Sequence, residues 1–188
     1  MKKRVIVGLT GASGSIYGIR LLEALQTLGV ETHLILSDWA IKNLELETDY
    51  ELSYIESLVA RKYDNQDLTA PVASGSFLTV GMVVVPCSMK TLAGIANGYS
   101  DNLLERAADV TIKEQRKLIL VPRETPLSPI HLENMLKLAR LGVVIAPPMP
   151  AFYIKPQSLM DLVNHHVGKI IDQFGLEHNL LKRWGEEP

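Results

Sequence analysis

The sequence is poor in cysteine and in net charge, and it lacks a long apolar run. Only one of its 188 residues is cysteine, which excludes an internal disulfide framework and suits a reducing compartment. A formal net charge of -2 gives no general attraction to nucleic acid or acidic membranes, so any anion site must use local basic groups. The apolar run near the N-terminus is broken at Thr10 and Gly11, too early for a signal or membrane segment. We therefore expect a cytoplasmic protein that binds neither nucleic acid nor membrane.

Length and composition fit one globular domain. The chain is 47% hydrophobic and long enough to bury a full core. Short apolar runs alternate with helical periodicity, and these runs lie at residues 5–7, 30–36, 81–86, 118–121 and 143–146. We predict a three-layer, doubly wound parallel α/β sheet of the Rossmann-like type. Residues 1–188 form the single domain, and the tail from about 175 to 188 is expected to dock at a subunit interface.

Two regions outside these runs carry further expectations. Residues 39–79 show no convincing central strand and are predicted to hold a helix through Glu47, another around Ser53–Arg61, and a loop. A helix begins at Ser128 and Pro129. We expect it to bury Leu132, Met135, Leu136 and Ala139.

The stretch Val5–Gly18 organises the chain, because it reads as a strand, a turn of small residues and a helix start. Residues 11–14 have no bulky side chain, so a ligand can approach backbone N–H groups at the positive end of the helix. Gly8, Gly11 and Gly14 are spaced three apart, unlike the G-x-G-x-x-G of dinucleotide-binding folds, and Gly8 fits close packing within the strand. Alone, the turn is compatible with a phosphate site or with an ordinary tight connection.

Polar residues follow three other strands at the edge where parallel sheets bind ligands. Ser37 fits a phosphate ligand or the N-cap of the next helix equally well. Residues 86–91 repeat the pattern of strand, small hydroxyl residues and helix start, which predicts a second anion-binding turn. Arg123 and Glu124 lie between two prolines, a stiff setting suited to a forked arginine contact with phosphate.

Other polar residues carry no function on pattern alone. Lys113 and Lys169 fit solvated lysines, the former paired with the acid four residues earlier. Cys87 fits a small buried residue at a strand end. His165 and His166 are adjacent and so face different directions, and no histidine has a second ligand at metal-binding spacing. We predict no metal site.

Taken together, nine short strings resemble the flavin prenyltransferases of the UbiX family. They are Gly11-Ala12-Ser13-Gly14, Glu47-Thr48-Asp49, Ser74-Gly75-Ser76, Pro86-Cys87-Ser88, Glu105-Arg106-Ala107-Ala108-Asp109-Val110, Lys113-Glu114, Val121-Pro122-Arg123-Glu124, His131-Leu132-Glu133-Asn134-Met135 and Phe152-Tyr153. Each string is weak alone, but their order and spacing are specific and span nearly the whole chain.

The resemblance implies an activity and partners. Members attach the dimethylallyl group of dimethylallyl phosphate to N5 and C6 of reduced FMN without a metal, and the prenylated FMN serves a UbiD-type decarboxylase. Their usual assembly is a dodecamer of identical chains with the site at subunit junctions. Breaking the allylic C–O bond leaves negative charge on phosphate, which cationic side chains stabilise where it develops.

The resemblance also assigns roles to residues. The implied FMN contacts are Gly11, Ala12, Ser13, Ser37, Ser88, Met89, Lys90, Thr91 and Arg123. The implied contacts to the allyl donor are Lys113, Arg123, Glu124, Tyr153, Lys169 and Trp184. Ser13 and Glu47 are implied to move protons near the flavin, and Glu124 is a candidate proton donor to phosphate. Lys169 replaces an arginine of some relatives, so a point-charge contact stands in for a forked one.

Two alternatives stay open. Residues 95–104 resemble a string of the flavin-dependent cysteine decarboxylases, but the substrate-binding asparagine of that family is absent from the loop Pro148-Met149-Pro150-Ala151. A non-catalytic FMN carrier is the other alternative. A carrier needs one phosphate site, whereas Lys113, Arg123 and Lys169 equip this chain for two.

Overall fold

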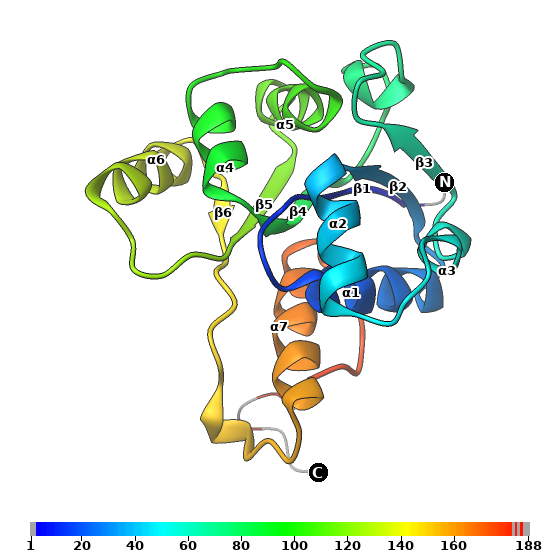
Figure 1. The fold of residues 1–188 in the computed structure, drawn as a ribbon, viewed down its shortest axis with the longest axis vertical. Helices are drawn as coiled ribbons and strands as arrows, with labels where there is room; N and C mark the ends of the chain where they lie inside the picture. Colours follow the sequence, from blue (N-terminus) through cyan, green and yellow to red (C-terminus); the bar gives the residue numbers. More distant parts are fainter. Residues whose placement is uncertain (1–2, 182, 184, 186–188) are drawn as a thin grey trace.

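The computed structural model describes residues 3–181, 183 and 185, and among them a parallel sheet of six strands forms the centre (Figure 1). The strands are β1 (Arg4–Leu9), β2 (Glu31–Leu36), β3 (Arg61–Asp64), β4 (Gly81–Cys87), β5 (Lys117–Pro122) and β6 (Val144–Ile145). Their order across the sheet is β3-β2-β1-β4-β5-β6, with every neighbouring pair parallel. The predicted α/β fold and its five predicted strands are confirmed.

Helices cover both faces of the sheet. They are α1 (Ser15–Thr27), α2 (Asp38–Glu47), α3 (Leu52–Ser57), α4 (Met89–Ala96), α5 (Leu103–Lys113), α6 (Pro129–Arg140) and α7 (Leu159–Gln173), with the 3-10 helices η1 (Pro71–Ala73) and η2 (Phe152–Ile154). Helices α4, α5 and α6 lie on one side, and α1 and α7 lie on the other (Figure 1). This arrangement gives the three predicted layers.

Alternate residues of β1 enter the two cores. Val5 and Val7 pack with the layer of α1 and α7, whereas Ile6 packs with the layer of α4 and α5. All three are at most 3% exposed, as expected for a strand covered on both faces. A Cβ atom on Gly8 would lie 2.9 Å from Leu104 Cδ1, so this strand glycine allows α5 to pack closely.

The chain changes direction across the sheet between β1 and β4. From β1 it proceeds outward through β2 to β3, and it then returns to the other side of β1 for β4, β5 and β6. In such sheets ligands bind beyond the carboxyl ends of the strands at this reversal. The turns that follow β1 and β4 are the two that the sequence predicts to bind anions.

One strand lies outside the sequence prediction. Residues 61–64 form edge strand β3, paired with β2, and the helix predicted around Ser53–Arg61 ends at Ser57. Of the four strand residues only Tyr63 is buried, so no apolar run reveals the strand. Edge strands are commonly this short and polar.

The predicted inner face of α6 is wrong for three of its four residues, whereas Met135 packs partly buried against the core. Leu132 and Leu136 are each 52% exposed and Ala139 is also exposed, whereas Leu138 is fully buried. The helix therefore turns three predicted core residues away from its own chain. Single apolar residues on a surface are ordinary, but a face of them marks a contact surface.

The segment between β6 and α7 runs away from the sheet before the chain returns along α7 (Figure 1). We call residues 147–158 the arm. Met149 and Phe152 are each 71% exposed on it. Within the described residues, no helix combines the length and apolar character needed to span a bilayer.

Candidate active site

A cleft of about 520 Å³ opens at the carboxyl edge where the strand order reverses. Residues from the ends of β1, β2 and β4 and from the start of α5 form its walls. Its lining includes Thr10, Gly11, Ser37, Asp38, Trp39, Asn65, Gln66, Ser88, Lys90, Thr91, Asp101, Asn102, Leu104 and Glu105. Five of the residues predicted to contact FMN are among them: Gly11, Ser37, Ser88, Lys90 and Thr91.

Thr10 joins the two turns at the base of this cleft. Its hydroxyl donates to the carbonyl of Pro86 at 2.8 Å and accepts from the backbone N–H of Ser88 at 2.7 Å. Thr10 is 3% exposed, so both bonds are shielded from water. The sequence reasoning treated Thr10 only as an interruption of an apolar run and missed this bridge.

Two helices present their N-termini to the cleft. The side chain of Ser37 accepts from Ala40 N at 3.1 Å and caps α2, and that of Ser88 accepts from Thr91 N at 3.3 Å and caps α4. Each serine oxygen accepts one backbone N–H group of its helix. The other N–H groups at the two N-termini favour a negatively charged ligand. The donor set, with the lysine at position 90, fits the phosphate of FMN. Met89 begins α4 beside these residues.

The start of α1 differs from this pattern because a carboxylate already occupies it. Glu47 Oε2 accepts from Gly14 N at 2.9 Å and Ser15 N at 3.0 Å. Gly14, with φ +108°, is the N-cap and offers no side chain. Of the N–H groups that this turn could present to a ligand, that of Gly14 is therefore already bound by Glu47.

The local charge of Glu47 follows from its partners. Burial raises the pKa of this carboxyl, but the N–H groups of Ser15 and Gly14 and the hydroxyl of Ser13 outweigh burial and hold the pKa below 4.5. Glu47 is therefore ionised at neutral pH, and the Ser13 hydroxyl lies close enough to help stabilise its charge. The pair predicted to move protons is thus in contact.

Gly11 is required by its neighbour Trp39. A Cβ atom on Gly11 would overlap the Cβ atom of Trp39, which follows the Ser37 cap on α2. Trp39 is 66% exposed and lines the cleft, and Lys42 Nζ lies 4.7 Å from its ring centre. Ala12, by contrast, is buried.

Arg123 and Glu124 follow β5 at the same carboxyl edge. The Arg123 N–H donates to the carbonyl of Cys87 at 3.3 Å, and Glu124 accepts from Thr125 N at 3.0 Å. Both side chains are exposed.

Burial raises the pKa of the Cys87 thiol far above its usual value, so this residue is an inert buried thiol as predicted.

Tyr153 and Lys169 belong to a second group of residues, on η2 and α7. The phenol oxygen of Tyr153 lies 3.3 Å from Nε2 of His165. Lys169 follows His165 by one helical turn, and its Nζ atom lies 3.8 Å from Oδ2 of Asp172. Trp184, also predicted to contact the donor, lies outside the described residues.

Lys113 lies at the opposite edge of the sheet. It ends α5 just before β5 begins at Lys117, which pairs with Gly81, the first residue of β4. Lys113 forms an ion pair with Glu114. The pairing predicted for it with Asp109 is wrong, because Asp109 binds Arg106 at 2.8 Å.

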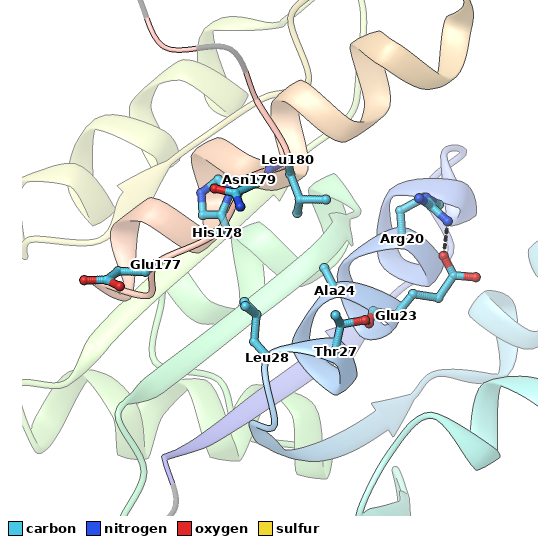
Figure 2. A pocket seen from close by; sticks show the side chains of 9 residues that line it. All are labelled: Arg20, Glu23, Ala24, Thr27, Leu28, Glu177, His178, Asn179 and Leu180. Atoms are coloured by element: carbon cyan, nitrogen blue, oxygen red, sulfur yellow. Dashed lines mark hydrogen bonds and ion pairs between the residues drawn. The ribbon is translucent and has the colours of Figure 1, made fainter. Parts of the chain in front are cut away.

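A second cleft, of about 570 Å³, lies between α1 and the tail that follows α7 (Figure 2). Figure 2 shows Arg20 and Glu23 on the α1 side and Glu177 and His178 on the tail side. The cleft also reaches Thr27, at the carbonyl end of α1, which disfavours anions. Its position and charge do not fit a phosphate ligand.

Comparison with known proteins identifies the family of the chain. The family model described as Flavoprotein matches residues 1–171. The flavin prenyltransferase LpdB of Lactiplantibacillus plantarum is 61% identical over 183 residues, which cover 97% of this chain and 98% of that protein.

Two solved structures share the fold along the whole chain. The crystal structure of AnUbiX (PadA1) in complex with FMN and dimethylallyl pyrophosphate has a TM-score of 0.97 and 50% identity, and each chain is fully covered. A dodecameric FMN-dependent UbiX-like decarboxylase from Escherichia coli O157:H7 has a TM-score of 0.95 and 54% identity, with 97% of this chain and 100% of that chain covered. The chain therefore belongs to the flavin prenyltransferases of the UbiX type, within the flavoprotein family.

Proposed function

We propose that the chain transfers the dimethylallyl group of dimethylallyl phosphate to N5 and C6 of reduced FMN, without a metal. The observation that supports this most directly is the cleft at the strand reversal, where the caps of α2 and α4 and Lys90 meet. FMN supplies the nucleophilic flavin ring and is also the acceptor of the prenyl group. Ser37, Ser88 and Thr91 bind its phosphate, while Gly11, Ala12 and Ser13 line the approach to the ring.

Ser13 and Glu47 handle protons in this proposal. Glu47 is ionised, and the nearby Ser13 hydroxyl helps to stabilise its charge. A carboxylate in contact with a hydroxyl can draw a proton through it from a substrate atom, as general base catalysis requires. Ser13 therefore faces the flavin, and Glu47 receives the proton behind it.

Phosphate departure is assigned to the basic residues and Tyr153. Arg123 offers a forked contact to the phosphate oxygens as the C–O bond breaks, and Glu124 donates a proton to the departing phosphate. Tyr153 and Lys169 supply further donors. A positively charged side chain stabilises the transition state most when it lies where the negative charge develops.

We infer that neighbouring subunits complete the site. Lys113 lies at the amino edge of the sheet, whereas Arg123 lies at the carboxyl edge, so one chain does not bring them together. The exposed apolar side chains of α6 and the arm offer contact surfaces for such neighbours. We propose a dodecamer, in which the tail of the single domain also docks on a neighbour.

The product is proposed to serve a UbiD-type decarboxylase, which takes up prenylated FMN. This assignment is supported by the family resemblance of the chain. A cytoplasmic location is likewise proposed, and the presence of only one cysteine in the chain supports it.

The decisive experiment incubates the purified protein anaerobically with reduced FMN and dimethylallyl phosphate, without added metal, and measures the mass of the released flavin. A prenyl-sized mass gain that Lys113→Ala and Arg123→Ala abolish supports the transferase. Unmodified FMN that stays bound instead indicates a carrier, and decarboxylation of a peptidyl-cysteine indicates a cysteine decarboxylase. A parallel reaction with the diphosphate donor tests the leaving group.

A further inference from the structure

His165 lies in the middle of α7 and contacts the phenol of Tyr153. Its Nε2 atom is 3.3 Å from the phenol oxygen, and the two rings meet edge to face at 84° with centres 5.5 Å apart. His165 is 6% exposed, whereas Tyr153 is 52% exposed. The buried imidazole of His165 therefore contacts the ring of Tyr153, about half of whose surface is exposed.

The imidazole of His165 is neutral near pH 7. Burial lowers its pKa, and the nearby charge of Lys169 lowers it further, while Asp172 opposes them. A neutral imidazole has one N–H donor and one acceptor nitrogen. The direction of its hydrogen bond to Tyr153 therefore depends on which nitrogen carries the proton.

The surroundings of the second nitrogen decide between the two tautomers. Nδ1 of His165 is buried, and no described residue offers it a hydrogen-bond partner. A buried N–H without an acceptor is rarer in proteins than a buried acceptor without a donor. The proton therefore belongs on Nε2, which donates to the phenol oxygen. The contact with His165 then does not use the phenol proton.

We propose that His165 is a positioning residue for the transfer reaction, which fixes the Tyr153 ring and directs its hydroxyl as a donor to the phosphate of the allyl donor. The inference rests on the proposed function. When the allylic C–O bond breaks, its electron pair stays on the phosphate oxygen, and the tyrosine hydrogen bond stabilises that charge without proton transfer. Donation from Nε2 to the phenol oxygen strengthens the phenol as a donor. Lys169, one turn along α7, adds positive charge to the same place.

The test compares two substitutions of His165 in the full-length protein loaded with reduced FMN. His165→Gln keeps an amide N–H near the position of Nε2, whereas His165→Phe keeps the ring shape and removes the donor. We expect His165→Phe to lower kcat/KM for dimethylallyl phosphate by roughly tenfold, the effect of one lost hydrogen bond. His165→Gln should recover most of this loss, and neither change should alter the Kd for FMN.

A double-mutant cycle with Tyr153→Phe separates positioning from a general loss of stability. In the Tyr153→Phe background, His165→Phe should cause no further loss of kcat/KM, because the hydroxyl that it orients is gone. His166→Phe is the matched control, since His166 is equally buried beside it but packs against Tyr17. Independent, multiplicative losses for the two substitutions, or a loss explained by weaker FMN binding, would overturn the proposal.

Binding of inorganic phosphate to the FMN-loaded protein gives a readout that does not depend on turnover. We expect His165→Phe and Tyr153→Phe to weaken phosphate binding by the same factor, and His165→Gln to restore it. Equal phosphate affinity in the wild type and His165→Phe would contradict the role of His165. If the wild type transfers no prenyl group from any donor, the proposed function fails, and this comparison still tests the pair by itself.

Discussion

The carboxylate of Glu47 lies 2.9 Å from the backbone nitrogen of Gly14, although 33 residues separate them in the chain. This hydrogen bond ties the last residue of α2 to the first turn of α1. It places a fixed negative charge at the position where the glycine-rich turn alone indicates a site for a bound anion. In the proposed function, the phosphate of FMN therefore binds at the ends of β2 and β4, and the opening turn faces the flavin ring.

Glu47→Gln tests this division of labour. The amide oxygen still accepts from Gly14 and Ser15, so α1 keeps its cap and loses about 1 kcal/mol of stability or less. The neutral amide cannot receive a proton from Ser13, so we expect kcat to fall by about 100-fold or more while the Kd for FMN is unchanged. Single-turnover mass spectrometry of the flavin and an FMN titration measure the two quantities.

The same substitution also has a pH signature. The hydrogen bonds hold the pKa of Glu47 below 4.5, so its ionised form stabilises the fold above that pH, and this stabilisation is lost as the pH falls through the depressed pKa. Thermal melting of Glu47→Gln should therefore depend less on pH than that of the wild type below pH 4.5. Parallel melting curves would show that the carboxylate does not stabilise α1.

Thr10→Val should weaken FMN binding through the turn after β4. The substitution keeps the shape of the side chain, but it leaves the Ser88 N–H without its buried acceptor and removes one of the two hydrogen bonds to the Pro86 carbonyl, which still accepts from Thr10 N. The cost is about 1–3 kcal/mol in stability, with a higher Kd for FMN because Ser88 is released. Thr10→Ser retains the hydroxyl and is the control. If both variants bind FMN equally well, the bridge does not position Ser88.

Gly75→Ala should impair the use of the allyl donor without affecting FMN. A Cβ atom at this position would overlap the Glu114 carboxylate and lie 3.0 Å from Lys113 Nζ, so it displaces the ion pair that holds Lys113. We expect KM for dimethylallyl phosphate to rise about tenfold. In a Glu114→Ala background the added methyl group has room, and the same substitution should then have little effect. An equal loss in both backgrounds would assign the effect to the loop itself.

We expect His166 to lower the free energy of unfolding of the protein as the pH falls. Burial lowers the pKa of His166 to about 4, although a hydrogen bond with the backbone of Ala146 opposes this shift, and the charge of His165 lowers the pKa further. Above pH 6.5 the ring is neutral whether folded or not, but between 6.5 and 4 the unfolded chain takes up a proton that the folded chain excludes. The resulting destabilisation reaches about 3 kcal/mol at the acid end of this window. Melting midpoints of the wild type should drop more across it than those of His166→Gln.

The sequence was sufficient for the sheet and for the cleft at its reversal, because both depend on local patterns. Uninterrupted apolar strands such as Val5–Val7 identify the buried sheet, and the serines that follow them mark the starts of helices, although the sequence left Ser37 open between a cap and a phosphate ligand. It was not sufficient for β3, whose burial is limited to Tyr63. Nor did helical periodicity orient α6, since it shows an apolar face without showing whether that face contacts its own chain.

Side-chain relationships across the fold were also out of reach from sequence. Glu47 contacts Gly14 only once α2 packs beside the start of α1, and Tyr153 contacts His165 only once the chain turns back from η2 along α7. Family resemblance assigned a role to Tyr153, but no local signal marked His165 as its partner. The resemblance also gave Lys113 and Arg123 one function without indicating that they occupy opposite edges of the sheet.

That separation leads to a prediction about mixed assemblies. If Lys113 of one subunit completes a site that contains Tyr153 of another, the variants Lys113→Ala and Tyr153→Phe damage different subunits of the same site. Mixing the two variants under conditions of subunit exchange should then create some sites with both native residues, and activity should rise well above the sum of the two parents.

The control for this experiment mixes two variants of the same local group, Tyr153→Phe and Lys169→Ala, which lie together on η2 and α7. Every subunit in that mixture lacks one member of the group, so no exchange of subunits restores it. Recovery in the first mixture and none in the second requires a site built across chains. If neither mixture recovers although exchange is complete, Lys113 and Tyr153 act from the same subunit, and these two residues do not build the site across chains.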